Sequence, residues 1–110
     1  MSEKFLIYLK DIKKAIESIT NFIHGMNFEQ FKNDDRTSSA VIRKFEIIGE
    51  ATKNIPDVIK EKYPQIPWKD ITGMRDKLIH AYSEVDLNLV WITIQKRLPE
   101  LKSFLDGMLK

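Results

Sequence analysis

Apolar side chains recur at helical spacing along almost the whole chain. Near each end they return alternately every four and three positions, which is the pattern of a helix with one buried face. The pattern predicts one long helix from Phe5 to about Gly25, and another that follows Asp86 as its N-cap. The apolar positions are Phe5, Leu9, Ile12, Ile16, Ile19 and Ile23 in the first segment, and Leu87, Trp91, Ile94, Leu98, Leu101, Leu105 and Met108 in the last.

The middle of the chain has further helical patterns, separated by polar and proline-containing breaks. A second long helix is predicted over residues 36–54, with shorter helical turns over residues 28–32 and 57–63 and another helix over residues 67–82. No segment has the alternating pattern of a strand. The sequence therefore predicts an all-α bundle of about five helices, forming a single domain over residues 1–110. The expected buried face of the second long helix is Ala40, Val41, Phe45, Ile48, Ala51 and Ile55.

The composition is that of a globular protein and excludes several kinds of site. The 110 residues include no cysteine, which excludes disulfides and thiolate metal sites and fits a cytoplasmic protein. The two histidines are scattered, so we expect no metal site, and no apolar run is long enough to span a membrane. The net charge of +2 permits RNA binding without requiring it, because affinity for phosphates comes from local clusters of basic residues.

A stripe of charged residues follows one face of the helix predicted over residues 36–54. It consists of Arg43, Glu46, Glu50 and Lys53, which are spaced by three, four and three residues. One interpretation is a solvated face with ion pairs along the helix. The other is that part of the stripe lines a polar cleft.

The most distinctive segment spans residues 75–82 and contains Arg75, His80 and Tyr82. A guanidinium that is always charged, beside an imidazole that titrates near neutrality, suits phosphate-ester chemistry. On a straight helix Arg75 and Tyr82 would share nearly one face, whereas His80 would lie about 140° away from Arg75. Convergence of the three groups therefore requires a loosened last turn, or a second copy of the segment from another subunit.

RNA cleavage is the reaction that these groups would support if they converge. The 2′-hydroxyl of RNA is an internal nucleophile, so a neutral imidazole can accept its proton and an imidazolium can protonate the leaving 5′-oxygen. A guanidinium can bind the phosphate and stabilise the charge that grows on its oxygens. From the residues alone a structural role stays open, in which Arg75 pairs with Glu46 or Glu50 and Tyr82 packs against apolar neighbours.

The segment at residues 75–82 resembles the Arg-x4-His-x-Tyr signature of HEPN-domain proteins of the HepT toxin type. The resemblance continues in order along the chain, through Ala40-Val41-Ile42-Arg43, Glu46-Ile47-Ile48-Gly49-Glu50-Ala51, Ile66-Pro67-Trp68, Gly73-Met74-Arg75, Val85-Asp86 and Val90-Trp91. It covers essentially the whole chain. The residue after the arginine is often asparagine in that family, and here it is Asp76, a carboxylate that could orient His80 but would repel RNA phosphate.

The resemblance implies a HEPN-like helical bundle that forms a homodimer with two motif copies facing a shared cleft. It implies a metal-independent ribonuclease toxin without a cofactor, in which Arg75 and His80 are catalytic and Arg43 and Glu50 lie near the cleft. It further implies a partner, a nucleotidyltransferase antitoxin of the MNT type, which transfers AMP from ATP to Tyr82. The RNA substrate would be tRNA or mRNA.

Two other functions stay open on the sequence alone. The chain could be a non-catalytic helical partner that serves only as the AMPylation substrate of a nucleotidyltransferase. It could also be a plain dimeric interaction bundle, although that function leaves the shared segment of arginine, histidine and tyrosine unexplained.

Overall fold

The computed structural model describes residues 4–81 and 84–109, with the side chains of residues 75, 79–81 and 84 left out of the description. The prediction of an all-α fold is confirmed. The described chain forms the helices α1 (Lys4–Phe22), α2 (Phe28–Lys32), α3 (Asp35–Lys53), α4 (Asp57–Lys62), α5 (Trp68–Leu78) and α6 (Leu87–Met108). Between the last two helices lie two very short strands, β1 (Ile79–Ala81) and β2 (Glu84–Val85).

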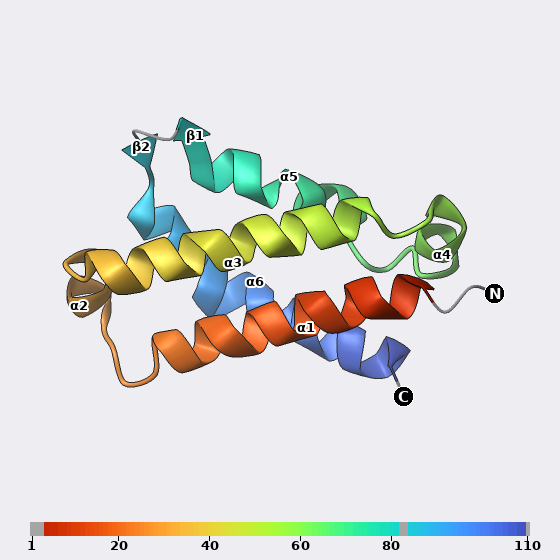
Figure 1. Ribbon diagram of the computed structural model, residues 1–110, viewed down its shortest axis with the longest axis horizontal. Coiled ribbons are helices and arrows are strands. Elements are labelled where there is room, and N and C mark those ends of the chain that lie inside the picture. The colour runs from red at the N-terminus through yellow and green to blue at the C-terminus, as the bar shows by residue number, and fades with distance from the viewer. Residues whose placement is uncertain (1–3, 82–83, 110) are drawn as a thin grey trace.

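The four long helices run back and forth along one elongated body (Figure 1). The body measures 45 × 28 × 21 Å along its principal axes. In Figure 1, α3 lies between α1 and α5, and α6 passes behind them. The short helices α2 and α4 lie at opposite ends of the body, where the chain turns into and out of α3.

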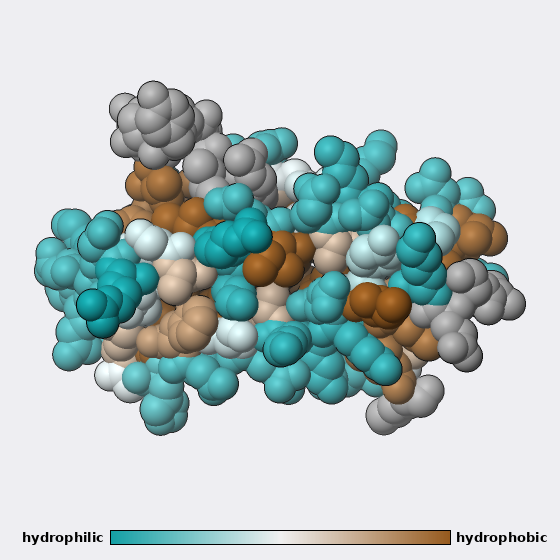
Figure 2. All heavy atoms as spheres, viewed as in Figure 1, coloured by the Kyte–Doolittle hydropathy of each residue, from teal (hydrophilic) through white to brown (hydrophobic). Residues whose placement is uncertain are grey.

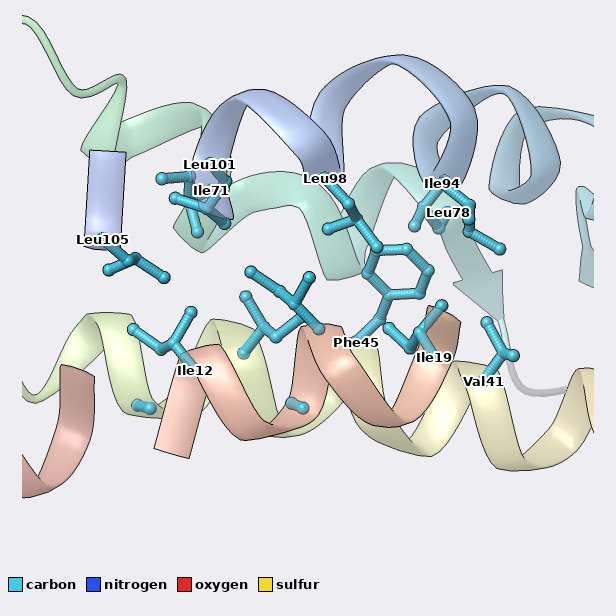
Figure 3. Close-up of a cluster of buried hydrophobic side chains, with 14 of the residues drawn as sticks. Ile12, Ile19, Val41, Phe45, Ile71, Leu78, Ile94, Leu98, Leu101 and Leu105 are labelled. Carbon is cyan, nitrogen blue, oxygen red and sulfur yellow. The ribbon is translucent and has the colours of Figure 1, made fainter. Parts of the chain in front are cut away.

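One apolar core fills the space between these four helices. Figure 3 shows side chains from α1 and α3 meeting those from α5 and α6, with the ring of Phe45 between Leu98 and Ile19. Phe45 is 2% exposed, and the predicted apolar faces of the long helices supply most of the buried residues. Burial of these apolar faces, rather than helix propensity, supplies most of the stability of such helices.

The helix predicted to reach Tyr82 ends four residues earlier, at Leu78. Residues 79–81 instead pair antiparallel with residues 84–85, with Ile79 opposite Val85, so the prediction of no strands is wrong here. β-branched side chains favour the extended conformation, and the chain has to reverse before α6. The backbone N–H of Asp86 donates to the carbonyl of Leu78 at 3.4 Å, which closes the hairpin onto the end of α5.

Local polar chemistry sets most of the other helix ends. Gly25 has a φ of 78°, a left-handed conformation that glycine adopts without strain, and it follows the end of α1. Asn27 and Gln30 form a reciprocal capping box at the start of α2. The side chains of Asp34 and Asp86 cap α3 and α6 by accepting from the backbone N–H groups of Thr37 and Leu89.

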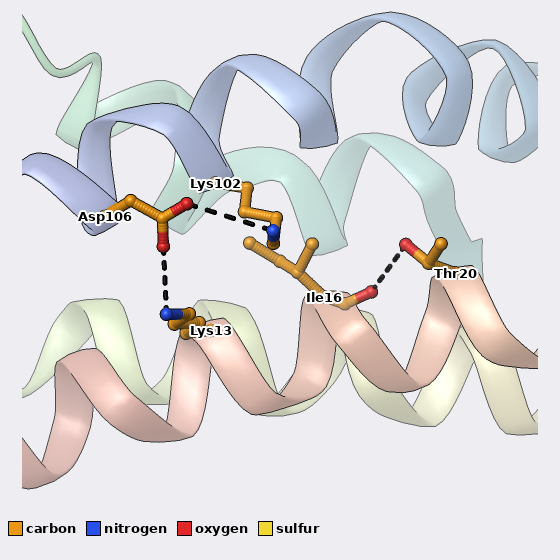
Figure 4. Close-up of polar contacts among 5 residues, drawn as sticks. All are labelled: Lys13, Ile16, Thr20, Lys102 and Asp106. Atoms are coloured by element: carbon orange, nitrogen blue, oxygen red, sulfur yellow. Dashed lines mark hydrogen bonds and ion pairs between the residues drawn. The ribbon is translucent and has the colours of Figure 1, made fainter.

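An ion-pair cluster joins the first helix to the last. The carboxylate of Asp106 lies 3.0 Å from the Nζ atom of Lys13 and 3.8 Å from that of Lys102 (Figure 4). The hydrogen bond and charge of Asp106 raise the pKa of Lys13 above its ordinary value. These residues are more than a third exposed, so the apolar contacts beneath them hold α1 against α6. Across the described residues, every helix is too short or too polar to cross a membrane.

Candidate functional site

The distinctive segment of the sequence lies across the junction of α5 and the hairpin. Arg75 and Asp76 are in the last turn of α5, and His80 is the middle residue of β1. Tyr82 and the side chains of Arg75 and His80 lie outside the described residues. The last turn does not continue as a straight helix, so the 140° separation expected on such a helix does not apply to Arg75 and His80.

A buried leucine fixes the position of this junction. Leu78 is 2% exposed and lies in the core between α5 and α6 (Figure 3). It stands three residues after Arg75 and two before His80. Since the core holds Leu78, it also holds the backbone on each side of it, which carries the two candidate catalytic residues.

A hollow of about 590 Å³ opens beside this junction, over the outer face of α3, and we call it the α3 hollow. Side chains of α1, α3 and α5 line it, including Arg43, Glu50 and Asp76. These are three of the four supporting residues expected from the sequence, and the fourth, Tyr82, lies outside the described residues. The structure therefore brings these three residues to one hollow. The view in Figure 2 looks onto α1 and α3, where hydrophilic side chains predominate and separate apolar patches interrupt them.

The charged stripe on α3 takes part in both arrangements that the sequence left open. Arg43 and Glu46 approach to 3.7 Å as an ion pair along the helix. All four residues of the stripe, Arg43, Glu46, Glu50 and Lys53, also line the α3 hollow. The stripe is thus a partly paired face of α3 and also one wall of a polar cleft.

Counted over the described residues, the lining of the α3 hollow is more acidic than the chain as a whole. Its lining includes four carboxylates, from Asp11, Glu46, Glu50 and Asp76, and two cationic side chains, from Arg43 and Lys53. An excess of carboxylates disfavours the approach of a phosphate backbone. Arg43 and Lys53 are the described cations that could bind a phosphate there, and Arg43 already lies 3.7 Å from the carboxylate of Glu46.

Two lining residues, Tyr8 and Asp11, were not predicted from the sequence. Both are on α1, next to the apolar positions Leu9 and Ile12, and a residue beside an apolar stripe lies at the edge of a helix interface. The sequence carries that signal. It does not carry the pairing of α1 with α3, which is what brings the two residues to the hollow.

The second histidine and the tryptophan of α6 do not line the α3 hollow. His24 is exposed just beyond α1. Trp91 packs against the rings of Phe31 and Phe28, with centroids 5.2 and 6.2 Å away. Among the described residues, no group of three or more His, Cys, Asp or Glu side chains could hold a metal ion.

Comparisons with known proteins agree with the resemblance seen in the motif. Residues 12–108 match the family model described as "Ribonuclease HepT-like". The chain is 48% identical to "Probable ribonuclease HepT" of Thermococcus cleftensis, over 94% of each chain. It is 47% identical to "Putative RNase MJ0125" of Methanocaldococcus jannaschii, over 94% of this chain and 89% of that one.

A relative from another organism matches to a similar degree. "Putative RNase TTE0752" of Caldanaerobacter subterraneus is 45% identical, over 86% of this chain and 85% of the relative. No solved structure matches the chain significantly. The family match covers α3, α5, the hairpin and α6, the elements that carry the segment and most of the α3 hollow. This chain therefore belongs to the HepT-like ribonuclease family.

Proposed function

We propose that this protein is an endoribonuclease that cleaves RNA without a metal ion, with Arg75 and His80 as its catalytic residues. The observation that carries the proposal is the family match over residues 12–108, which includes the whole Arg-x4-His-x-Tyr segment. The proposal gains support from the core position of Leu78, which fixes the backbone between the two catalytic residues.

The reaction uses the 2′-hydroxyl of the substrate as its nucleophile. A neutral histidine accepts the proton of the 2′-hydroxyl while its oxygen forms a bond to phosphorus. The bond from phosphorus to the 5′-oxygen breaks, and an imidazolium donates a proton to that oxygen. The products are a 2′,3′-cyclic phosphate and a 5′-hydroxyl, and Arg75 stabilises the charge on the phosphate oxygens in the transition state.

Each chain contributes one motif histidine, so a homodimer supplies the acid and the base from two copies of His80. Because carboxylates outnumber cations among the described lining residues of the α3 hollow, we assign the binding of the phosphate to Arg75. Arg43 and Glu50 line the cleft from α3. Asp76 lines it from α5, and its carboxylate orients His80.

The activity is that of a toxin, controlled by a nucleotidyltransferase antitoxin. The antitoxin transfers AMP from ATP to the hydroxyl of Tyr82, which forms a phosphodiester and releases pyrophosphate. The added phosphate pairs with Arg75 and the nucleotide obstructs RNA, so that modification switches the nuclease off.

An RNase assay tests the catalytic part of this proposal. Purified, unmodified protein is incubated with total tRNA in EDTA, and the fragment ends are mapped. The wild type should give fragments ending in 2′,3′-cyclic phosphate, and His80→Ala should reduce the rate by roughly 10²- to 10⁴-fold because it removes the acid and base. Arg75→Ala should cause a loss of about 10²- to 10³-fold.

The second histidine provides a matched control. His24→Ala removes an exposed imidazole outside the site and should cleave like the wild type. Intact RNA with wild-type protein, or equal activity of His80→Ala, would exclude the catalytic proposal. Intact RNA would favour the alternative, a non-catalytic helical partner that is only the AMPylation substrate of a nucleotidyltransferase.

The tyrosines test the regulatory part. Tyr82→Phe should cleave RNA normally and resist inhibition by the nucleotidyltransferase with ATP, because the acceptor hydroxyl is gone. Tyr63→Phe, which changes a tyrosine beyond the end of α4, should still gain the mass of AMP and lose activity. AMP transfer to the Tyr82→Phe protein would show that another residue is the acceptor.

A further inference from the structure

A second hollow, of about 670 Å³, lies between α4 and α5, and we call it the tryptophan hollow. Its lining includes Trp68, together with Lys60, Lys69 and Gly73. Thr72 and Asp76 line this hollow and the α3 hollow alike, so the two meet along one side of α5. The tryptophan hollow is therefore continuous with the proposed site.

Trp68 is held rigidly at this hollow. Its indole Nε1–H donates to the carbonyl oxygens of Lys60 and Tyr63, each at 3.1 Å, at the end of α4. The ring is half-buried and packs in part against the core. Because its one polar group is satisfied within the protein, the exposed part of the ring is an apolar surface in a fixed orientation.

The other lining groups fit a nucleotide. Two lysines, Lys60 and Lys69, supply positive charge. Three carboxylates, from Asp57, Glu61 and Asp76, supply oxygens that accept hydrogen bonds from the amino groups of a base. A Cβ atom added at Gly73 would meet nothing within 4 Å, so the side of α5 is open at that position. Mixed charges of this kind around a flat apolar ring suit an uncharged, hydrogen-bonding base better than a bare anion.

The tryptophan hollow lies about one nucleotide's reach from the segment that carries Arg75 and His80. Positions 68 and 75 are seven residues apart on α5, which brings their backbone to one side of the helix about 10 Å apart along its axis. A base that lies at Trp68 would belong to a nucleotide that flanks the scissile phosphate, rather than to the one that reacts.

We propose that the tryptophan hollow binds an unpaired nucleobase of the RNA substrate, which stacks on the indole ring of Trp68. Stacking on aromatic side chains is the usual way in which proteins hold single-stranded nucleic acid, and it needs no particular sequence. The proposal rests on the proposed ribonuclease function for the identity of its ligand. If a base stacks on Trp68, the RNA must be single-stranded at a nucleotide that flanks the scissile phosphate.

Fluorescence of Trp68 tests the stacking directly. The chain has two tryptophans, so Trp91→Phe leaves Trp68 as the only indole. This protein is titrated with a short 2′-O-methylated oligocytidylate, which cannot be cleaved because its nucleophile is blocked. Stacking should quench the Trp68 emission, and an abasic strand with the same number of phosphates should leave it unchanged.

Two variants measure the contribution to binding. Trp68→Leu should weaken binding of the oligonucleotide by roughly 5- to 150-fold, the range for loss of one stacked base. Gly73→Leu should also weaken it, because the new side chain enters the hollow while leucine favours the helix more than glycine does. Gly107→Leu changes an exposed glycine near the end of α6, where a Cβ likewise meets nothing, and should bind like the wild type.

The outcomes separate this inference from the proposed function. Binding without quenching, or with unchanged affinity in Gly73→Leu, would overturn the inference and leave the ribonuclease proposal standing. Quenching and weakened binding with no cleavage of ordinary RNA would support the inference and overturn the catalytic proposal. Absence of any binding to the oligonucleotide would overturn the inference, whereas the cleavage of ordinary RNA decides the catalytic proposal separately.

Discussion

Single polar side chains determine where several helices begin, and this information is local. Asp34 accepts hydrogen bonds from the backbone N–H of Thr37 at 3.0 Å and from the hydroxyl of Thr37 at 2.7 Å. An aspartate at position 34 or 35 can be assigned as the N-cap from the sequence alone, because the cap and the N–H group that donates to it are only three residues apart. Tyr8 and Asp11 could not be assigned to the α3 hollow, because their place there depends on which helix packs beside α1.

The cap at Asp34 should make stability depend on pH. Hydrogen bonds from Thr37 lower the pKa of Asp34 in the folded protein, so its stabilisation is complete above the ordinary pKa of an aspartate. It is lost as the pH falls through the folded pKa. Asp34→Ala should therefore unfold at lower urea concentration than the wild type at pH 7, and the difference should narrow in acid.

Asp35→Ala is the matched control, because Asp35 is the exposed neighbouring carboxylate in the first turn of α3. Urea titrations at several pH values would give the free energy of unfolding for each protein. A difference between Asp34→Ala and the wild type that stays constant from pH 7 into acid would exclude ionisation of Asp34 as the cause.

At the scale of elements, the sequence predicted the helices well and the hairpin not at all. Apolar periodicity located all four long helices, because each buries one face against a common core. The sequence pattern wrongly extended α5 through Tyr82, because residues 79–82, considered by themselves, are compatible with a helix. The contact that ends α5 joins Asp86 to Leu78 across eight residues, and no local pattern reports it.

Asp86 links this hairpin to the last helix and provides a test at the element scale. Its Oδ1 accepts from the backbone N–H of Leu89 at 3.0 Å, and its own N–H donates to Leu78. Asp86→Ala should lower the free energy of unfolding by about 1 kcal/mol, the usual cost of losing an N-cap. It should also speed hydrogen exchange at the start of α6, and RNA cleavage should fall because β1 carries His80.

Asn88→Ala serves as the control, since Asn88 is exposed in the first turn of α6 and is not the cap. Global stability is read by urea denaturation and local opening by exchange of single amides. Unchanged exchange at the start of α6 in Asp86→Ala would mean that the cap does not hold this end of the helix.

At the scale of the whole molecule, several large apolar side chains remain outside the core. Ile7 is 59% exposed, Val58 56% and Ile92 43%, and Phe22 and Leu89 are also exposed. Leu89 and Ile92 are three residues apart on α6, so they lie on one side of that helix near the hairpin. Exposed apolar side chains that lie close together on a small domain are typical of a surface for association.

We predict that the protein is a dimer at micromolar concentration, because one motif histidine per chain is too few for the acid and base roles. Light scattering on a sizing column should give twice the chain mass of 12.9 kDa. Nuclease activity should then fall on dilution below the dissociation constant of the dimer. A mass of one chain together with full activity would exclude the shared cleft.

The antiparallel path of the chain leaves α1 beginning and α6 ending at the same end of the bundle, far from the hairpin (Figure 1). A fluorescent label, an affinity tag or a surface anchor attached near either of these helix ends would therefore stand away from His80. Because both helix ends lie at the same end of the bundle, a peptide linker could also join them. The chain could then be opened elsewhere as a circular permutant, and the segment that carries Arg75 and His80 would stay continuous.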